Sequence, residues 1–180
     1  NAGSLWGRPF YILREAWNIL NAIAEGKIES GDEKKLNALK GETMAVIALC
    51  QFDLTRCFGY PYTKDKGASL GAPLIDHLVG TYENPPRSTV AQAYDFIIET
   101  LEEAVTLMSE EKNNGRMNKY AARALLARIY LYHDDNRKAF DLADQLIKDA
   151  DTSGSYALYP HEKYVAAWSV EAKFWFRIVF

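Results

Sequence analysis

Residues 118–150 read NKYAARALLARIYLYHDDNRKAFDLADQLIKDA, and this stretch decides the fold. Its first part, about 118–132, is rich in alanine and follows a helical pattern. Asp134 and Asp135 then form a turn and cap a second helix, which covers about 136–150. A turn this short between two helices places them side by side and antiparallel.

Small residues in this helix pair match a tetratricopeptide repeat (TPR). Ala127 stands at the small position where the first helix meets the second, and Ala139 opens the second helix. Two alanines permit a close crossing, and Tyr130 fills the space beside them. Asp151 replaces the proline that usually ends the repeat. Because TPRs are scaffolds, the motif predicts a helical fold and says little about function.

Two further helices are predicted in the N-terminal half. Apolar residues recur at helical spacing over about 10–26 and about 33–57, and Asp32 is the expected N-cap of the second helix. Between 44 and 54 this second helix is apolar nearly all round, so we expect it to pack on more than one side. Gly41 costs a helix about 1 kcal/mol relative to Ala, so a start near Gly41 is the alternative.

A capping box marks the start of another helix after a long irregular segment. The helix opens at Ser88 or Thr89, and Thr89 with Gln92 matches the box. Its apolar stripe consists of Val90, Tyr94, Ile97, Leu101, Ala104 and Met108. Before it, glycines and prolines interrupt residues 58–87, which we predict to form a loop without a helix. Loops this long in compact domains are often functional.

The predicted fold class is all-α: an array of TPR-like helical hairpins, or α-α superhelix, with a small extended element at the C-terminus. The extended element rests on residues 156–159 and on the strand-like run 173–180. The length fits one domain over residues 1–180.

Composition narrows the possible functions. The 21 basic and 24 acidic side chains give a net charge of −3, whereas nucleic-acid binding usually needs a basic excess. The sequence has no run of 18 apolar residues, and no signal peptide is visible. Cys50 and Cys57 would lie roughly 10 Å apart on one helix, beyond disulfide reach. We therefore expect two free, buried cysteines.

No catalytic or metal-binding constellation stands out. His77, His133 and His161 are far apart in sequence, so we expect histidines at the surface or in hydrogen bonds. There is no phosphate-binding loop and no Gly-x-Ser-x-Gly motif. A glycosidase active site needs only two carboxylates at the right spacing, and the sequence singles out no acidic residue as a member of such a pair. We predict a binding protein, not an enzyme, with no catalytic residues, no metal and no cofactor.

Aromatic residues make up 13% of the chain, and several lie outside the predicted helices. An exposed ring can stack on the apolar face of a sugar while nearby polar groups bind its hydroxyls. Trp6, Tyr82 and Trp168 are the candidate ligand-binding residues: the first two are least embedded in helical pattern, and Trp168 follows in a loop-like context. The common alternative is that aromatic residues in loops pin those loops to the protein body.

Five segments together resemble the SusD/RagB family in order and spacing, over nearly the whole chain. They are GETMAVIALCQFDLTRCFG (41–59), GAPLI (71–75), PRSTV (86–90) with the residues that follow it, GRMNK (115–119) with the alanine-rich helix, and YAL (156–158). Two positions depart from the family pattern. Ile47 replaces the usual arginine and Gln51 the common histidine or tyrosine, and both are expected to affect helix packing more than ligand binding.

The resemblance implies a surface-exposed lipoprotein of the outer membrane, of the kind used in Bacteroidetes-type polysaccharide utilisation. Such proteins bind a glycan or another nutrient and deliver it to a SusC-like TonB-dependent transporter. Family members are several hundred residues long, so residues 1–180 would be the TPR-bearing part of a longer protein, without its signal, lipid anchor and C-terminal region. The alternatives are a generic TPR scaffold for protein–protein interaction and an accessory module of a glycan hydrolase.

Overall fold

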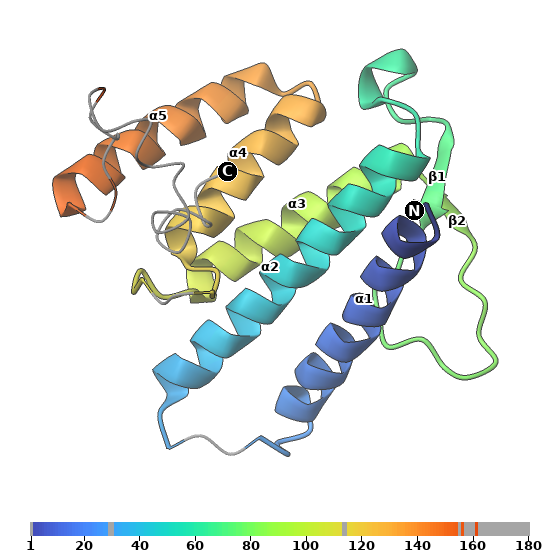
Figure 1. Cartoon of the computed structure of the whole chain (residues 1–180), viewed down its shortest axis with the longest axis horizontal. Helices are drawn as coiled ribbons and strands as arrows, with labels where there is room; N and C mark the ends of the chain where they lie inside the picture. Colours follow the sequence, from blue (N-terminus) through green and yellow to red (C-terminus); the bar gives the residue numbers. More distant parts are fainter. Residues whose placement is uncertain (1, 29–30, 113–114, 155, 157–160, 162–180) are drawn as a thin grey trace.

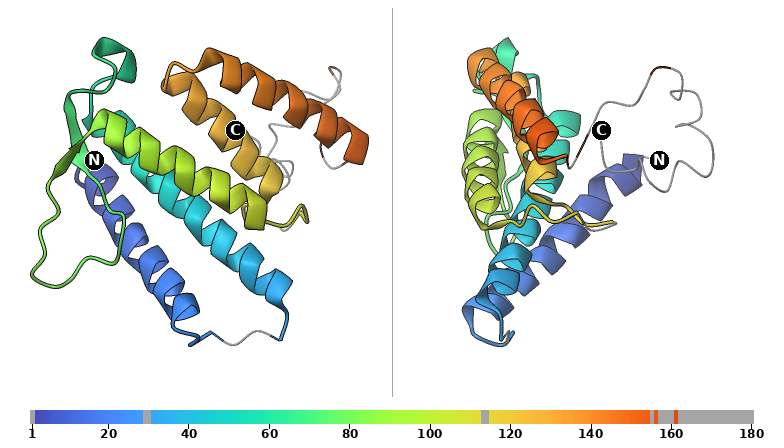
Figure 2. Two further views of the ribbon diagram at one scale, coloured as in Figure 1. Left: turned by 180° about the vertical axis from the view of Figure 1, so that it is seen from behind. Right: turned by 90° about the vertical axis from the view of Figure 1, so that its left-hand side faces the viewer.

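The computed structural model describes residues 2–28, 31–112, 115–154, 156 and 161. Across these residues, consecutive helices run antiparallel, and α1, α2 and α3 lie side by side (Figures 1 and 2). The helices are α1 (Ala2–Ala24), α2 (Glu33–Phe58), α3 (Val90–Leu107), α4 (Lys119–Tyr132) and α5 (Asn136–Ser153). The predicted helical fold is confirmed. None of these helices is long and apolar enough to cross a membrane.

Helix α2 lies between α1 and α3 (Figure 1). Asp32 caps it, as predicted, by accepting hydrogen bonds from backbone N–H groups of the first turn. The helix continues through Gly41, where α3 approaches so closely that an added Cβ would lie 2.8 Å from Ala104 O and from Met108 Cγ. The alternative start near Gly41 is therefore wrong, because the glycine serves the packing of α2 on α3.

The capping box at the start of α3 is confirmed. The Thr89 hydroxyl accepts a hydrogen bond from the Gln92 backbone, and the Gln92 side chain accepts one from the Thr89 backbone. All six residues of the predicted apolar stripe are buried, in one cluster with residues of α2, α4 and α5. This cluster is the main core of the described chain.

Helices α4 and α5 form the predicted antiparallel hairpin (Figure 1). Asp135 caps α5 by accepting a hydrogen bond from the backbone of its first turn. Ala139 is buried and Ala127 is half-buried. The Tyr130 hydroxyl donates to the Glu102 carboxylate on α3, so this residue also joins the hairpin to the preceding helix.

Two boundaries differ from the sequence prediction. Helix α1 begins at Ala2, not near residue 10, and it contains Pro9. The segment 58–87, predicted to lack a helix, includes the 3₁₀ helix η1 (Tyr62–Lys64).

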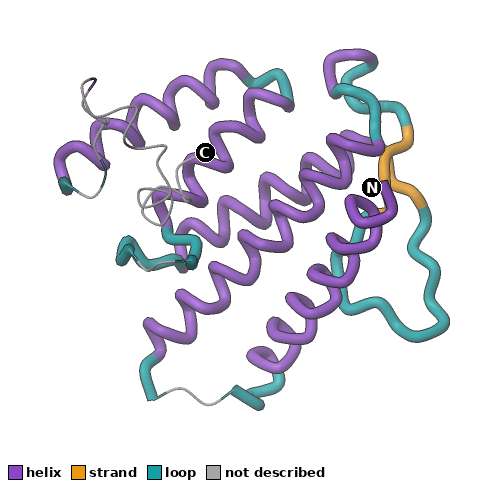
Figure 3. Tube along the Cα trace, viewed as in Figure 1, coloured by secondary structure: helices purple, strands orange, loops and turns teal. Residues whose placement is uncertain are grey.

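A strand pair also lies in and beside this segment: β1 (Leu70–Pro73) pairs antiparallel with β2 (Arg87–Thr89) (Figure 3). Arg87 strengthens the pair by donating hydrogen bonds to the Gly71 and Leu70 carbonyls, at 2.7 and 3.0 Å. The extended element predicted near the C-terminus lies outside the described residues, apart from Tyr156.

A second buried cluster joins α1, α2 and β1. Cys50 belongs to it, and burial, with a smaller effect of Asp53, raises the pKa of its thiol to about 11. Cys57 is exposed, so the expectation that both cysteines are buried is wrong for this residue. Both thiols are free, as the distance between them predicts.

Candidate ligand-binding cleft

The loop formed by residues 74–86 connects β1 to β2 (Figure 3). Side chains from two helices bind the base of this loop. The Trp17 indole N–H on α1 donates to the Ile75 carbonyl at 3.1 Å. The fully buried Gln51 amide on α2 donates to the Pro73 carbonyl at 3.1 Å and accepts from the Ile75 backbone N–H at 3.3 Å. These three bonds fix the position where the loop leaves β1.

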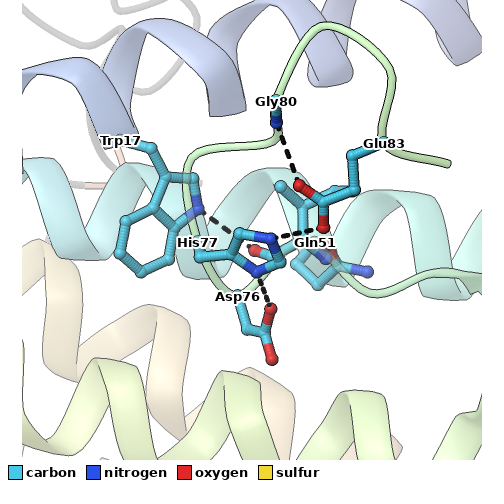
Figure 4. A network of polar contacts seen from close by, with 7 residues as sticks. Trp17, Gln51, Asp76, His77, Gly80 and Glu83 are labelled. Atoms are coloured by element: carbon cyan, nitrogen blue, oxygen red, sulfur yellow. Dashed lines mark hydrogen bonds and ion pairs between the residues drawn. The ribbon is translucent and has the colours of Figure 1, made fainter. Parts of the chain in front are cut away.

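A histidine bridge closes the loop on itself (Figure 4). His77 Nδ1 lies 2.6 Å from Asp76 Oδ1, and its Nε2 lies 2.6 Å from Glu83 Oε1. The other oxygen of Glu83 accepts the Gly80 backbone N–H at 3.0 Å. Hydrogen bonds to Asp76 and then Glu83 raise the pKa of His77. The bond from Gly80 and then that from His77 lower the pKa of Glu83.

Between this loop and α1 lies a cleft of about 530 Å³. Its apolar lining comes from Phe10, Pro73, Ile75, Val79 and Pro85, and its polar side chains are Arg14, Thr81 and Asn84. Arg14 pairs with Glu15 at 3.0 Å and keeps 58% of its side chain exposed. A few polar groups on mostly apolar walls suit a small amphipathic ligand.

Two of the three candidate ligand-binding residues lie near this cleft. Trp6 is part of α1, not of a loop, and packs edge-on against the cleft residue Phe10 at 5.0 Å and against Phe58 at 4.7 Å. Tyr82 is 96% exposed in the loop, next in sequence to the cleft residue Thr81. With so little of it covered, Tyr82 does not pack against Trp6. Trp168 lies outside the described residues.

Other loop aromatics anchor the chain, as the alternative interpretation predicted. Tyr62 packs edge-on against Tyr94 at 5.6 Å. The Tyr156 hydroxyl accepts a hydrogen bond from the Asn118 amide at 3.0 Å, and its ring packs against Tyr120 at 5.7 Å. These two rings therefore hold their segments to helices.

The three histidines have different surroundings. His77 and His161 are exposed, whereas His133 is half-buried with its ring centroid 4.2 Å from Tyr62 and 5.5 Å from Tyr94. The His133 Nδ1 atom is buried without a hydrogen-bond partner, so the expectation of a surface or hydrogen-bonded histidine is wrong here. In the described part of the chain, no three His, Cys, Asp or Glu residues are grouped as a metal site.

Sequence reasoning missed the residues that shape the cleft. Phe10, Arg14 and Trp17 were part of, or next to, a predicted helix, and nothing in their spacing marked them as cleft residues. Gln51 did carry a signal, because it is one of the few polar residues in an otherwise apolar helix. A buried polar side chain needs partners, so it could have been predicted to bind a distant backbone segment.

Two similar solved structures come from Bacteroides species. A SusD superfamily protein from Bacteroides thetaiotaomicron is 40% identical, with a TM-score of 0.86 over 91% of this chain and 35% of that one. A putative sugar binding protein from Bacteroides vulgatus is 39% identical, with a TM-score of 0.86 over 92% of this chain and 37% of that one.

A curated relative and a family model agree with these structures. A SusD-like protein from Bacteroides ovatus is 25% identical over 133 residues, which is 73% of this chain and 22% of that protein. The chain thus spans between about a fifth and two fifths of the length of these relatives. A SusD-like family model described as "Starch-binding associating with outer membrane" matches residues 1–131. The chain therefore belongs to the SusD-like family.

Proposed function

We propose that this chain is part of a non-catalytic protein that binds a glycan or a similar nutrient in the cleft between α1 and the loop 74–86. The cleft is the observation that carries the proposal: it holds about 530 Å³ beside an almost fully exposed tyrosine. Its apolar walls can pack against the C–H face of a sugar ring. Arg14, Thr81 and Asn84 supply hydrogen-bonding groups for hydroxyls.

The three aromatic candidates have different parts in this proposal. Tyr82 presents a ring next to the cleft residue Thr81, so it is the first choice for stacking on a sugar. Trp6 supports the cleft through Phe10 and, at 40% exposure, still offers part of its ring. Trp168 stays in the proposal as a third ligand-binding residue on the basis of the sequence alone.

The whole protein in this proposal is a surface-exposed lipoprotein of the outer membrane. Residues 1–180 form its single TPR-bearing domain, and the longer protein adds a lipid anchor and a C-terminal region. It delivers the bound glycan to a SusC-like TonB-dependent transporter, and nucleic acid is not a partner. The description of the matching family, which associates with the outer membrane, supports this location.

Calorimetry on the longer protein tests the cleft, beginning with maltoheptaose as a starch oligosaccharide and continuing with other soluble glycans. We expect Tyr82→Ala and Asn84→Ala each to weaken binding, by up to about tenfold for the tyrosine because a stacked ring contributes on the order of 1 kcal/mol. Tyr60→Ala is the matched control, since Tyr60 is also exposed, at 56%, but does not line the cleft.

Binding that survives both cleft substitutions would place the glycan site elsewhere. Hydrolysis of any glycan in the panel, lost on replacing one acidic residue, would show that the protein is an enzyme. Both outcomes can be read from the same set of purified variants.

One observation favours a second function, docking of a protein partner on the TPR hairpin. Phe140 and Ile147 are 65% and 69% exposed on α5, and exposed apolar side chains one heptad apart are typical of a helix that packs on another surface. Phe140→Glu with Ile147→Glu is expected to leave glycan binding intact and to weaken copurification with the transporter. Loss of glycan binding in this variant would count against two separate surfaces.

A further inference from the structure

The geometry of the His77 bridge defines its protonation state. Both ring nitrogens lie 2.6 Å from a carboxylate oxygen, and a carboxylate can only accept a hydrogen bond. Both nitrogens must therefore donate, which requires the imidazolium form. A neutral imidazole has one N–H, so it would set a lone pair against either Asp76 or Glu83.

The bridge also shapes one wall of the cleft. Glu83, held by His77, accepts the Gly80 N–H with its second oxygen, and its own backbone N–H donates to the Gly80 carbonyl at 3.1 Å. Gly80 and Thr81 line the cleft opposite Phe10 and Arg14 (Figure 4 shows the bridge). The base of the loop is held by Trp17 and Gln51, whose side chains do not ionise. The hydrogen bonds of the His77 bridge are therefore the ones in this loop that change with pH.

We propose that His77 and Glu83 are positioning residues that hold the wall formed by Gly80 and Thr81 in its binding geometry only while His77 is doubly protonated. This inference rests on the proposed function of the cleft. It predicts that glycan affinity is highest at mildly acidic pH and falls when His77 loses its second proton. Neither residue has to touch the sugar.

The direction of this pH dependence follows from the pKa shifts of His77 and Glu83. The pKa of His77 is raised by Asp76 and Glu83, so its contribution is present below the ordinary value of about 6.5 and is lost as pH rises through the raised value. The pKa of Glu83 is lowered by Gly80 and His77, so the bridge fails at the acidic end only when Glu83 is protonated.

Among the charged groups around the loop, His77 is the one that changes its protonation state near neutral pH. Asp76 and Glu83 face it within the loop, and α1 contributes Arg14, which lines the same cleft, paired with Glu15. At the contact with α2 the loop meets the neutral amide of Gln51. Of these side-chain types, only imidazole ordinarily changes charge between about pH 5 and 8.

A titration of the longer protein, labelled at histidine, tryptophan and glycine nitrogens, tests positioning without any ligand. We expect the Gly80 amide signal to shift with the same midpoint as the His77 ring, and this coupling to vanish in His77→Gln and Glu83→Gln. His161→Gln is the control, because His161 is another exposed histidine that lies outside the loop. The Trp17 indole signal should stay nearly constant, since it reports the base of the loop.

Calorimetry with maltoheptaose at pH 5.5, 6.5 and 8 completes the test. We expect at least a fivefold fall in affinity between the first and last pH, and a weak, pH-independent affinity in His77→Gln. The inference would be overturned if the Gly80 amide signal did not shift with the His77 ring. It would also be overturned if the wild-type protein bound maltoheptaose equally well at all three pH values. Gly80 signals that follow His77 with no maltoheptaose binding at any pH would support the positioning and count against the proposed function instead.

Discussion

At the scale of a residue, Gln51 shows how one buried amide joins a loop to a helix. Its side chain is fully buried in α2 and binds both the carbonyl of Pro73 and the N–H of Ile75. Buried polar groups left without partners cost about 1–3 kcal/mol each, so this amide stabilises both α2 and the base of the loop. The cleft depends on that base, because Pro73 and Ile75 also line it.

Gln51→Met tests this role, because methionine has a similar shape but cannot form either hydrogen bond. We expect the free energy of unfolding to fall by about 1–3 kcal/mol, since two backbone groups of the loop lose a buried partner. The measurement is chemical denaturation of the 180-residue chain. Gln145→Met is the control, because Gln145 is exposed on α5. Equal midpoints for the two variants would mean that the Gln51 bonds contribute nothing net.

The same residue shows what the sequence could and could not predict. The sequence shows Gln51 as a polar residue within an apolar helix, which predicts an effect on helix packing. Its partners lie 22 and 24 residues away, in a segment whose position depends on the pairing of β1 with β2. Nothing local in the sequence specifies that pairing, so a distant backbone partner for Gln51 could be predicted, but not which segment supplies it or where the cleft lies.

At the scale of an element, Gly41 and Gly7 are two helical glycines with opposite expected responses to alanine. Alanine is favoured over glycine in a helix by about 1 kcal/mol. At Gly7 an added Cβ meets nothing within 4 Å, so Gly7→Ala should stabilise the chain by up to about 1 kcal/mol. At Gly41 the Cβ would meet backbone and side-chain atoms of α3 and of its C-cap Met108 at 2.8–3.0 Å.

Overpacking a close helix crossing typically costs about 1–3 kcal/mol, so we expect Gly41→Ala to destabilise the chain despite its helix propensity. The denaturation midpoints of both variants, compared with that of the wild-type chain, show whether each substitution stabilises or destabilises the chain. A stabilised Gly41→Ala variant would show that α2 and α3 can separate slightly without loss, and that the glycine is not required for their packing.

The starts of helices with strong local signals were predicted, whereas the start of α1, which depends on distant contacts, was not. Asp32 and Thr89 are capping residues whose effect acts within one turn, so the starts of α2 and α3 were correct. The first turns of α1 contain Gly7 and Pro9, and Trp6 there packs against Phe58 of α2. Such an extension depends on tertiary packing rather than on propensity.

At the scale of the whole molecule, the cleft is formed by residues about 60–75 positions apart in the sequence. Phe10 and Arg14 come from α1, and Val79 to Pro85 come from the loop between the two strands. The antiparallel course of α1 and α2 brings the loop back beside α1, where Phe10 and Arg14 face the cleft (Figure 2). The helical pattern predicted the array of helices, but the position of a loop on that array is set by a few long-range bonds such as Trp17 to Ile75.

The chain spans little more than a third of each of the two solved relatives, and this bears on how strongly it can bind alone. We expect the 180-residue chain to bind maltoheptaose about two- to tenfold more weakly than the longer protein. Tyr82 is 96% exposed, so few contacts hold its ring in place, and ordering such a side chain on binding costs about 0.5–1.5 kcal/mol. Additional contacts from the longer protein would order this ring before the sugar arrives.

Parallel calorimetry on the chain and on the longer protein measures the difference, with light scattering to show that both samples are monomeric. Tyr82→Ala in both backgrounds separates two causes of weak binding. If ordering of Tyr82 limits the short chain, the substitution should reduce affinity more in the longer protein, where the ring is already held. Equal wild-type affinities would contradict the prediction and place the complete glycan site within these 180 residues, because contacts that lie elsewhere could then add nothing to binding.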